Sequence, residues 1–164
     1  DPSKEDTDMG PMINIHAAQR IEEQVNKTIE QGATLVCGGK REDAYYYPTI
    51  LDNVTKDMDV AKDMEIFGPV ISVIGFDTEE EAIEIANQSS FGLCGCVITK
   101  DYSRGIKIAN KLECGGAVVN GASFYRSFEM PFGGWKHSGI SNEGVSSTLE
   151  EMSRIKTIVL KNIL

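Results

Sequence analysis

Several kinds of residue are scarce in this sequence, and each shortage argues against a class of protein. Histidine occurs only twice, as His16 and His137, far apart in the chain, so we expect no metal site. The 16 lysines and arginines are outnumbered by 25 aspartates and glutamates, which gives a formal net charge of -9. Because phosphate binding needs clustered cations, we also expect no nucleic-acid surface.

Signals for membranes and secretion are missing too. No stretch approaches the ~20 apolar residues of a membrane-spanning helix, and residues 1–6 lack the apolar core of a signal peptide. The four cysteines show no C-x-x-C spacing and are too few for a disulfide framework in 164 residues. We therefore expect a soluble, cytoplasmic protein with reduced thiols and no membrane partner.

None of these cysteines is predicted to be a nucleophile. Cys37, Cys94, Cys96 and Cys114 have no obvious histidine or helix N-terminus nearby to activate a thiolate. Cys94 and Cys96 are two residues apart on a predicted strand and would share one face. Core packing is the favoured interpretation there, with redox chemistry or metal ligation as the alternative.

The glycine pairs do not form a known phosphate-binding motif. Gly38-Gly39, Gly115-Gly116 and Gly133-Gly134 lack both the G-x-G-x-x-G spacing between a strand and a helix and the pattern of a P-loop. The simplest interpretation is that they allow turns with positive φ.

The chain is long enough for one globular domain with its own core, since 41% of its 164 residues are hydrophobic. Asn14 is a plausible N-cap for a helix with an apolar stripe from Ile15 to Ile29, which Gly32 would end. Short strand-like pieces follow up to Leu51.

From residue 70 a strand-helix-strand-helix-strand pattern is predicted. Val70–Phe76 is a nearly continuous apolar run, typical of a strand buried on both faces. Thr78 and Glu81 form a capping box for the next helix. A strand over 93–99, a helix over 103–112 and a strand over 116–120 complete the series. Such alternation favours parallel strands in a layered α/β sheet.

The last third of the chain is predicted to be irregular. Residues 121–142 form a long aromatic-rich loop, and long loops are often functional. A short helix over 145–152 leads to an alternating strand over 154–161. A terminal strand without a neighbour favours pairing with another subunit.

Glu65 is the best candidate for a binding carboxylate. It lies in Glu65-Ile66-Phe67-Gly68-Pro69, directly before the predicted strand, where it could accept two ribose hydroxyls while Phe67 packs beside a flat heterocycle. From the residues alone, a surface glutamate in a turn before a strand is the favoured interpretation.

Four motifs decide between these alternatives by their residues and order. They are Glu65-Ile66-Phe67-Gly68-Pro69-Val70, Ala86-Asn87-x-x-x-Phe91-Gly92-Leu93, Pro131-Phe132-Gly133-Gly134-x-Lys136-x-Ser138-Gly139 with Glu143-Gly144, and Lys156-Thr157-Ile158-Val159. Together they resemble the aldehyde dehydrogenase superfamily. The opening Asp1-Pro2 and Met9-Gly10-Pro11-Met12 fit as well, so the resemblance covers essentially the whole chain.

The resemblance implies NAD(P)-dependent oxidation of a small-molecule aldehyde to a carboxylate through a cysteine nucleophile. It places Glu65 at the nicotinamide ribose and Phe67 beside the nicotinamide ring. Phe132 falls in the aldehyde tunnel, and residues 123–128, with Phe124, correspond to the loop that shapes substrate choice. Arg126 in this loop could pair with an anionic group of a semialdehyde such as succinate semialdehyde; a pair with Glu129 or a solvated side chain is the alternative.

The family's nucleophile, base and cofactor domain have no counterpart in these 164 residues, so no catalytic residue is predicted. We expect a truncated aldehyde dehydrogenase catalytic domain, of α/β class with a parallel-strand three-layer sheet, over residues 1–152. An oligomerisation strand over residues 153–164 would follow. NAD or NADP would bind only to the complete enzyme, a homodimer or tetramer, and the fragment alone would be inactive. The alternative is a non-catalytic assembly module that pairs through its C-terminal strand.

Overall fold

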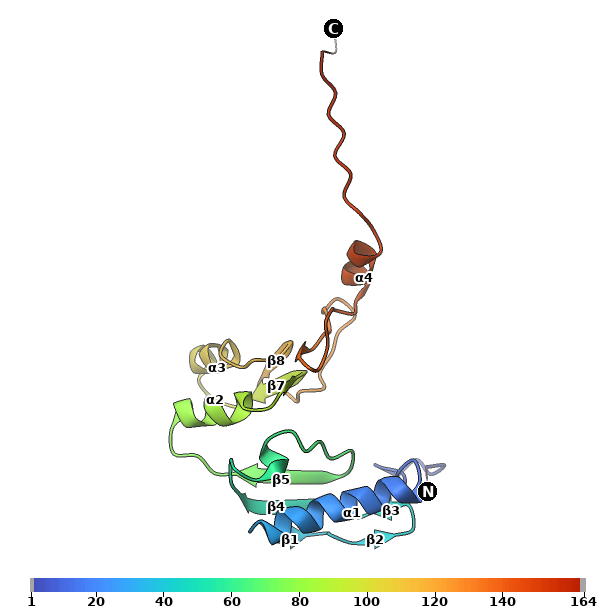
Figure 1. Ribbon diagram of the computed structural model, residues 1–164, viewed down its shortest axis with the longest axis vertical. Coiled ribbons are helices and arrows are strands. Elements are labelled where there is room, and N and C mark those ends of the chain that lie inside the picture. The colour runs from blue at the N-terminus through green and yellow to red at the C-terminus, as the bar shows by residue number, and fades with distance from the viewer. Residues whose placement is uncertain (1, 163–164) are drawn as a thin grey trace. The chain divides into compact units, whose positions relative to one another are not determined.

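The computed structural model describes residues 2–162 and divides into two compact units (Figure 1). Unit 1 extends up to Ser90 and unit 2 begins at Phe91. Both units combine helices with strands, so the predicted α/β class is confirmed. Each unit is described by itself below.

Unit 1 is built on a three-stranded sheet in the order β1-β4-β5. Strand β4 pairs antiparallel with β1 and parallel with β5. A small hairpin, β2 with β3, lies outside this sheet. The elements are α1 (Ile15–Glu30), β1 (Thr34–Cys37), β2 (Arg41–Glu42), β3 (Tyr45–Tyr46), β4 (Thr49–Val54), η1 (Asp59–Ala61), β5 (Val70–Ile74) and α2 (Glu79–Asn87).

Helix α1 forms as its sequence predicts. The Asn14 side chain accepts a hydrogen bond from the Ala17 N–H at 2.8 Å, which satisfies one of the free N–H groups of the first turn. Gly32, with φ of 114°, follows the helix and ends it. The buried positions recur at helical spacing on one face and are Ala18, Ile21, Val25 and Thr28.

This face of α1 packs on the sheet and makes the core of unit 1. Ile21 and Val25 join Leu51 and Val54 of β4, and Leu51 is 0% exposed. Val70 and Ile74 of β5 pack against the same cluster. The core therefore fixes the segment between η1 and β5 from both ends, because Val60 and Ala61 also pack on it.

Strand β5 differs from its prediction. Ile71 and Val73 are 62% and 44% exposed, so the strand is not buried on both faces. Its burial alternates along the strand, because α1 covers the face of Val70 and Ile74 while the other face has no cover within unit 1. The Thr78 capping box is confirmed: the Glu81 N–H donates to Thr78 Oγ1 at 3.1 Å, and the Asp77 N–H donates to the Glu81 carboxylate at 2.8 Å.

Unit 2 contains one parallel strand pair, β7 and β8, joined through α3. This confirms the strand-helix-strand prediction for this part of the chain. The Asp101 side chain caps α3 by accepting from the Arg104 N–H at 3.0 Å. The elements are β6 (Phe91–Gly92), β7 (Cys94–Val97), α3 (Tyr102–Ala109), β8 (Gly116–Val119), β9 (Trp135–Lys136) and α4 (Val145–Glu151).

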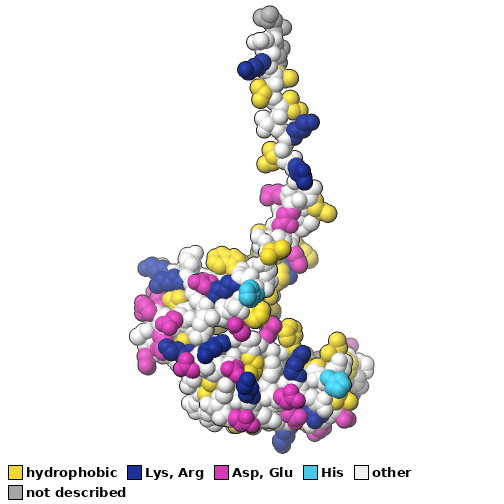
Figure 2. Space-filling view, viewed as in Figure 1, with side chains coloured by type: hydrophobic (Ala, Val, Ile, Leu, Met, Phe, Trp, Pro, Cys, Tyr) yellow, Lys and Arg dark blue, Asp and Glu magenta, His cyan; other side chains and the backbone are white. Residues whose placement is uncertain are grey.

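Two long-range predictions are not observed. Strands β5 and β7 belong to different sheets, so the described residues do not show the single layered sheet that the alternation predicted, and the three-layer sheet implied by the resemblance is not confirmed. Residues 153–162 run as an extended segment without helix or strand (Figure 1), and its side chains are exposed, with apolar and basic groups interspersed along it (Figure 2). A strand needs a hydrogen-bonded neighbour, and the described part of the chain supplies none to this segment. Residues 163–164 of the expected oligomerisation strand lie outside the described residues.

Candidate functional site

The segment that carries Glu65 and Phe67 connects η1 to β5 in unit 1. Glu65 is exposed and Phe67 is 69% exposed, whereas Ile66 between them packs against the core. This alternation turns the carboxylate and the aromatic ring outward together. The segment therefore presents a hydrogen-bond acceptor next to an uncovered ring, the two features that a ribose with an attached flat heterocycle would use.

Helix α1 holds this segment in place. The Gln24 side-chain amide donates to the Glu65 carbonyl oxygen at 3.2 Å. Gly68 lies so close to the helix that a Cβ there would clash with the Ile21 side chain. Ile21 is almost fully buried, so it has little room to move. The position of Glu65 thus depends on contacts to the best-packed helix of unit 1.

Unit 2 carries candidate residues of its own. The Arg126 guanidinium carbon lies 3.6 Å from the centre of the Phe132 ring, a cation–π contact. Both residues belong to the connection between β8 and β9. Arg126 is exposed, and within the described residues its charge has no ion-pair partner. Its donors are available to an anion.

Glu129 is not the partner of Arg126. Hydrogen bonds from its own backbone N–H and from Ser127 lower the pKa of the Glu129 carboxyl. Phe124, the remaining predicted substrate residue, is 84% exposed. A cavity of about 20 Å³ beside Arg126 and Phe132 also contacts Tyr125. That volume holds about one water, so unit 2 by itself does not enclose a substrate.

The glycine-rich motif of unit 2 serves close backbone packing. A Cβ on Gly115 would clash with the Gly133 carbonyl, and one on Gly134 would meet Ser138 at 2.5 Å. Neither Gly115 nor Gly133 has positive φ, so the turn interpretation is wrong for them, although it holds for Gly38 and Gly39 at φ of 77° and 69°. Nearby, the Gly92 N–H donates to the Ser138 hydroxyl at 2.9 Å, which joins β6 to the motif.

The cysteines show no activated thiol. Burial is the main cause that raises the pKa of Cys114, and the neighbouring Cys94 adds to it, so this thiol stays protonated. Cys37 and Cys96 are exposed and Cys94 is half-buried, so the expected core packing of Cys96 is not found. The face of β7 that carries Cys96 is left open within unit 2.

The structure brings together Glu65 with Phe67, and Arg126 with Phe132, each pair inside its own unit. Gln24 is the contact that the sequence did not reveal. It lies 41 residues before Glu65, and a glutamine on a helix carries no local signal for such a partner.

Among the described residues there is no group of three or more His, Cys, Asp or Glu side chains that could hold a metal ion. No described helix is both long and apolar enough to span a membrane.

Comparisons with known proteins agree on one family. The model of the aldehyde dehydrogenase family matches residues 1–158. The chain is 43% identical over 159 residues to a lactaldehyde dehydrogenase of Methanococcus aeolicus, covering 97% of this chain and 34% of that protein. The chain spans about a third of the length of the curated relatives it matches.

Two solved structures are similar over nearly the whole chain. One is a glyceraldehyde-3-phosphate dehydrogenase of Methanocaldococcus jannaschii with NADP, at 44% identity and a TM-score of 0.91 over 98% of this chain and 35% of that one. The other is aldehyde dehydrogenase 21 of Physcomitrella patens with its product succinate, at 34% identity and a TM-score of 0.92 over 99% and 34%. On the family match and the motifs that carry it, this chain belongs to the aldehyde dehydrogenase family.

Proposed function

We propose that this chain supplies part of the nicotinamide site and of the aldehyde tunnel of an NAD(P)-dependent aldehyde dehydrogenase. The observation that carries the proposal is the exposed pair Glu65 and Phe67, held outward by buried Ile66 and by the Gln24 hydrogen bond. A cofactor-binding segment must keep such groups uncovered and fixed at once. A structure similar to this chain contains NADP, which supports a nicotinamide cofactor.

A bound nicotinamide cofactor would supply the hydride acceptor for the aldehyde carbon. The Glu65 carboxylate would accept hydrogen bonds from the two ribose hydroxyls, and such charge-assisted bonds would hold the sugar. The Phe67 ring would limit the orientation of the attached heterocycle. Both residues act by positioning, which matters because transfer requires the reacting atoms to be held close together.

A chimera tests this role. This chain replaces the matching third of the Methanococcus aeolicus lactaldehyde dehydrogenase, and NAD(P)-dependent aldehyde oxidation is measured. We expect turnover in the chimera and a rise of about tenfold or more in KM for the cofactor on Glu65→Gln, from loss of charge-assisted hydrogen bonds. Glu80→Gln, an exposed glutamate of α2, is the matched control. An unchanged cofactor KM in Glu65→Gln would sink the proposal.

The isolated chain should not oxidise aldehydes. A thiolate nucleophile is required, and burial raises the pKa of the Cys114 thiol, which keeps it protonated. We expect no NAD(P)-dependent turnover by pure chain in an absorbance assay for the reduced cofactor. Robust turnover would refute this part of the proposal.

Arg126 supports a second, finer proposal, that the substrate carries an anionic group, as a semialdehyde does. Its guanidinium lies over the Phe132 ring without an ion-pair partner among the described residues, and the similar plant enzyme was solved with succinate. In the chimera, Arg126→Lys and Arg126→Ala should lose activity on succinate semialdehyde and keep activity on a neutral aldehyde of equal length. An equal loss on both aldehydes would contradict anion recognition.

Assembly is the alternative function, and one feature favours it. The side chains of Ile155, Ile158 and Leu160 are 101%, 72% and 74% exposed on an extended segment, as in a strand without its neighbour. We propose that residues 153–164 pair with another subunit of a cytoplasmic homodimer or tetramer, and that the three-layer sheet is completed in the full enzyme. Light scattering after size exclusion tests this: assembly by the isolated chain that is lost on deletion of residues 153–164 would support the module.

A further inference from the structure

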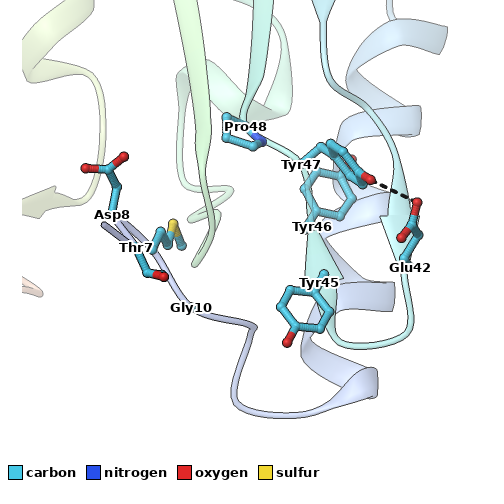
Figure 3. A pocket seen from close by; sticks show the side chains of 9 residues that line it. Thr7, Asp8, Gly10, Glu42, Tyr45, Tyr46, Tyr47 and Pro48 are labelled. Carbon is cyan, nitrogen blue, oxygen red and sulfur yellow. Dashed lines mark hydrogen bonds between the residues drawn. The ribbon is translucent and has the colours of Figure 1, made fainter. Parts of the chain in front are cut away.

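Unit 1 contains a cavity that none of the candidate-site residues lines. Its volume is about 560 Å³. Residues 7–10 line one side, and the tyrosines at 45–47 line the opposite side (Figure 3). Small-molecule sites commonly measure about 300–1,000 Å³, so this cavity is of the size that holds a ligand.

Strand register explains why aromatic and acidic side chains meet here. In the hairpin of β2 and β3, Glu42 lies opposite Tyr45, so both side chains are on one face. Tyr47 follows two residues after Tyr45 and belongs to the same side. Tyr46 lines the cavity too but is 6% exposed and belongs to the core, whereas Tyr45 and Tyr47 are 49% and 42% exposed.

The opposite wall is attached to the hairpin by the backbone. The Met12 N–H donates to the Ala44 carbonyl oxygen at 2.8 Å, at the turn between β2 and β3. This bond brings the preceding segment, with Asp8 and Met9, up to the tyrosines. The cavity is therefore built from two segments of the chain rather than from one open turn.

The lining is acidic and carries no compensating cation. Asp8 and Glu42 both line the cavity, and no lysine or arginine is among its lining residues. The nearby Arg41 is engaged elsewhere, since its Nε donates to Glu22 at 2.8 Å. Tyr47 donates its hydroxyl to the Glu42 carboxylate at 2.9 Å. That bond raises the pKa of Tyr47, so the phenol remains neutral.

We propose that this cavity binds a small organic ammonium cation, attracted by the rings of Tyr45 and Tyr47 and by the carboxylate of Glu42. Aromatic rings attract cations through their quadrupole, and carboxylates add a long-range attraction. Met9 and Pro48 supply apolar contacts for alkyl groups on the nitrogen. The site therefore fits a methylated or alkylated ammonium better than a bare metal ion, which would need more oxygen ligands.

The test uses choline as the probe and the 164-residue chain. Amide NMR titration at low salt follows choline and its neutral isostere, in which a carbon replaces the ammonium nitrogen. We expect choline to shift residues 7–10 and 42–48, and the isostere to bind about tenfold more weakly, from loss of the cation–π attraction. Equal binding of the two, or shifts that sodium chloride reproduces at equal ionic strength, would overturn the proposal.

Substitutions distinguish the loss of an aromatic contact from a general disturbance of the fold. Tyr45→Phe keeps the ring and should retain binding, whereas Tyr45→Leu should weaken it about tenfold. Glu42→Gln should weaken it about threefold and reduce its salt dependence, because the amide oxygen still accepts from Tyr47 without the charge. Tyr102→Leu, an exposed tyrosine of unit 2, is the control. Unchanged binding in Tyr45→Leu, or equal loss in Tyr45→Phe and Tyr45→Leu, would contradict the proposed aromatic contact.

Discussion

The two units differ in the groups that they bury, which are apolar side chains in unit 1 and glycine backbone in unit 2. In unit 1, side chains from α1, β4 and the neighbouring turns form a continuous apolar cluster around Leu51. In unit 2, the only described residues that are buried are Gly92 and Gly105, which have no side chain to bury. Unit 1 is thus held by its side chains, whereas unit 2 is held by close backbone contacts and strand hydrogen bonds.

This difference assigns different roles to the units. A core such as that of unit 1 can hold an exposed loop in place, which is what Glu65 and Phe67 need. The strands of unit 2 form two-stranded sheets, β6-β9 and β7-β8, and sheets of this size are marginal alone. Unit 2 also exposes large apolar groups, among them Ile98, Ile106 and Phe128 at 83%, 55% and 94%. We interpret unit 2 as a surface completed by other parts of the enzyme.

Deleting a core side chain of unit 1 should have the largest effect. Leu51→Ala creates a cavity at a fully buried site, and we expect a loss of about 2–5 kcal/mol in the free energy of unfolding. Urea unfolding followed by circular dichroism reports the helices, while fluorescence of Trp135, the one tryptophan, reports unit 2. If the units are independent, the Trp135 midpoint stays unchanged. Leu149→Ala, 69% exposed on α4, is the control and should change little.

Adding one methyl group should break unit 2. Gly115→Ala places a Cβ against the Gly133 carbonyl, and overpacking of this kind costs about 1–3 kcal/mol. The urea concentration at the midpoint of the Trp135 fluorescence transition should fall. Most of the helical circular dichroism, to which α1 contributes the longest helix, should be retained. Gly75→Ala is the control, since a Cβ there meets nothing within 4 Å. Equal stability of Gly115→Ala and the parent chain would show that backbone packing does not hold unit 2.

Removing the Gln24 amide should have a smaller, functional effect. Gln24→Ala deletes one hydrogen bond to the Glu65 carbonyl, worth about 0.5–1.5 kcal/mol. In the chimera we expect KM for the cofactor to rise about threefold while kcat changes little. The control is Glu23→Ala, an exposed neighbour on the same helix. A fall in kcat with unchanged KM would show that Gln24 does not act through cofactor binding.

The ion pair between Lys27 and Asp59 should give the smallest effect. The two charges are 2.6 Å apart, and the hydrogen bond from Lys27 lowers the pKa of the Asp59 carboxyl. A lowered folded-state pKa stabilises the fold above the unfolded value of about 3.9, and this contribution is lost as pH falls through the lower folded value. The free energies of unfolding of Asp59→Asn and of the parent chain, measured with urea, should therefore differ at pH 7 and be closer together at pH 3. The same difference in free energy of unfolding at both pH values would show that the Lys27–Asp59 ion pair does not cause it.

Local features were predictable from the sequence. The Asn14 cap, the Gly32 stop and the Thr78 capping box each depend on residues within four positions of one another, so their chemistry is visible in the sequence. The strand-helix-strand unit from Cys94 to Val119 was predictable for the same reason, since its crossover is a single short helix.

Long-range pairings were not predictable. Nothing in Val70–Ile74 shows that β5 pairs with β4 and leaves one face open, because a continuous apolar run fits a strand with one or two covered faces. Strand propensity at residues 154–161 likewise could not show whether the chain supplies a neighbour. At the site, the outward pair Glu65 and Phe67 follows from alternation, but the contact with Gln24 depends on tertiary packing.

The close approach of Gly68 to Ile21 has a consequence for genetics. Because the proposed cofactor segment rests directly on a core side chain, substitutions of Ile21 should disturb folding and, if that proposal holds, cofactor affinity together. A screen for lost activity would recover buried positions of α1 alongside Glu65, and abundance measurements would be needed to tell the two groups apart. At Gly68 itself, any added side chain must displace Ile21, so selection on activity would also preserve the packing of this helix.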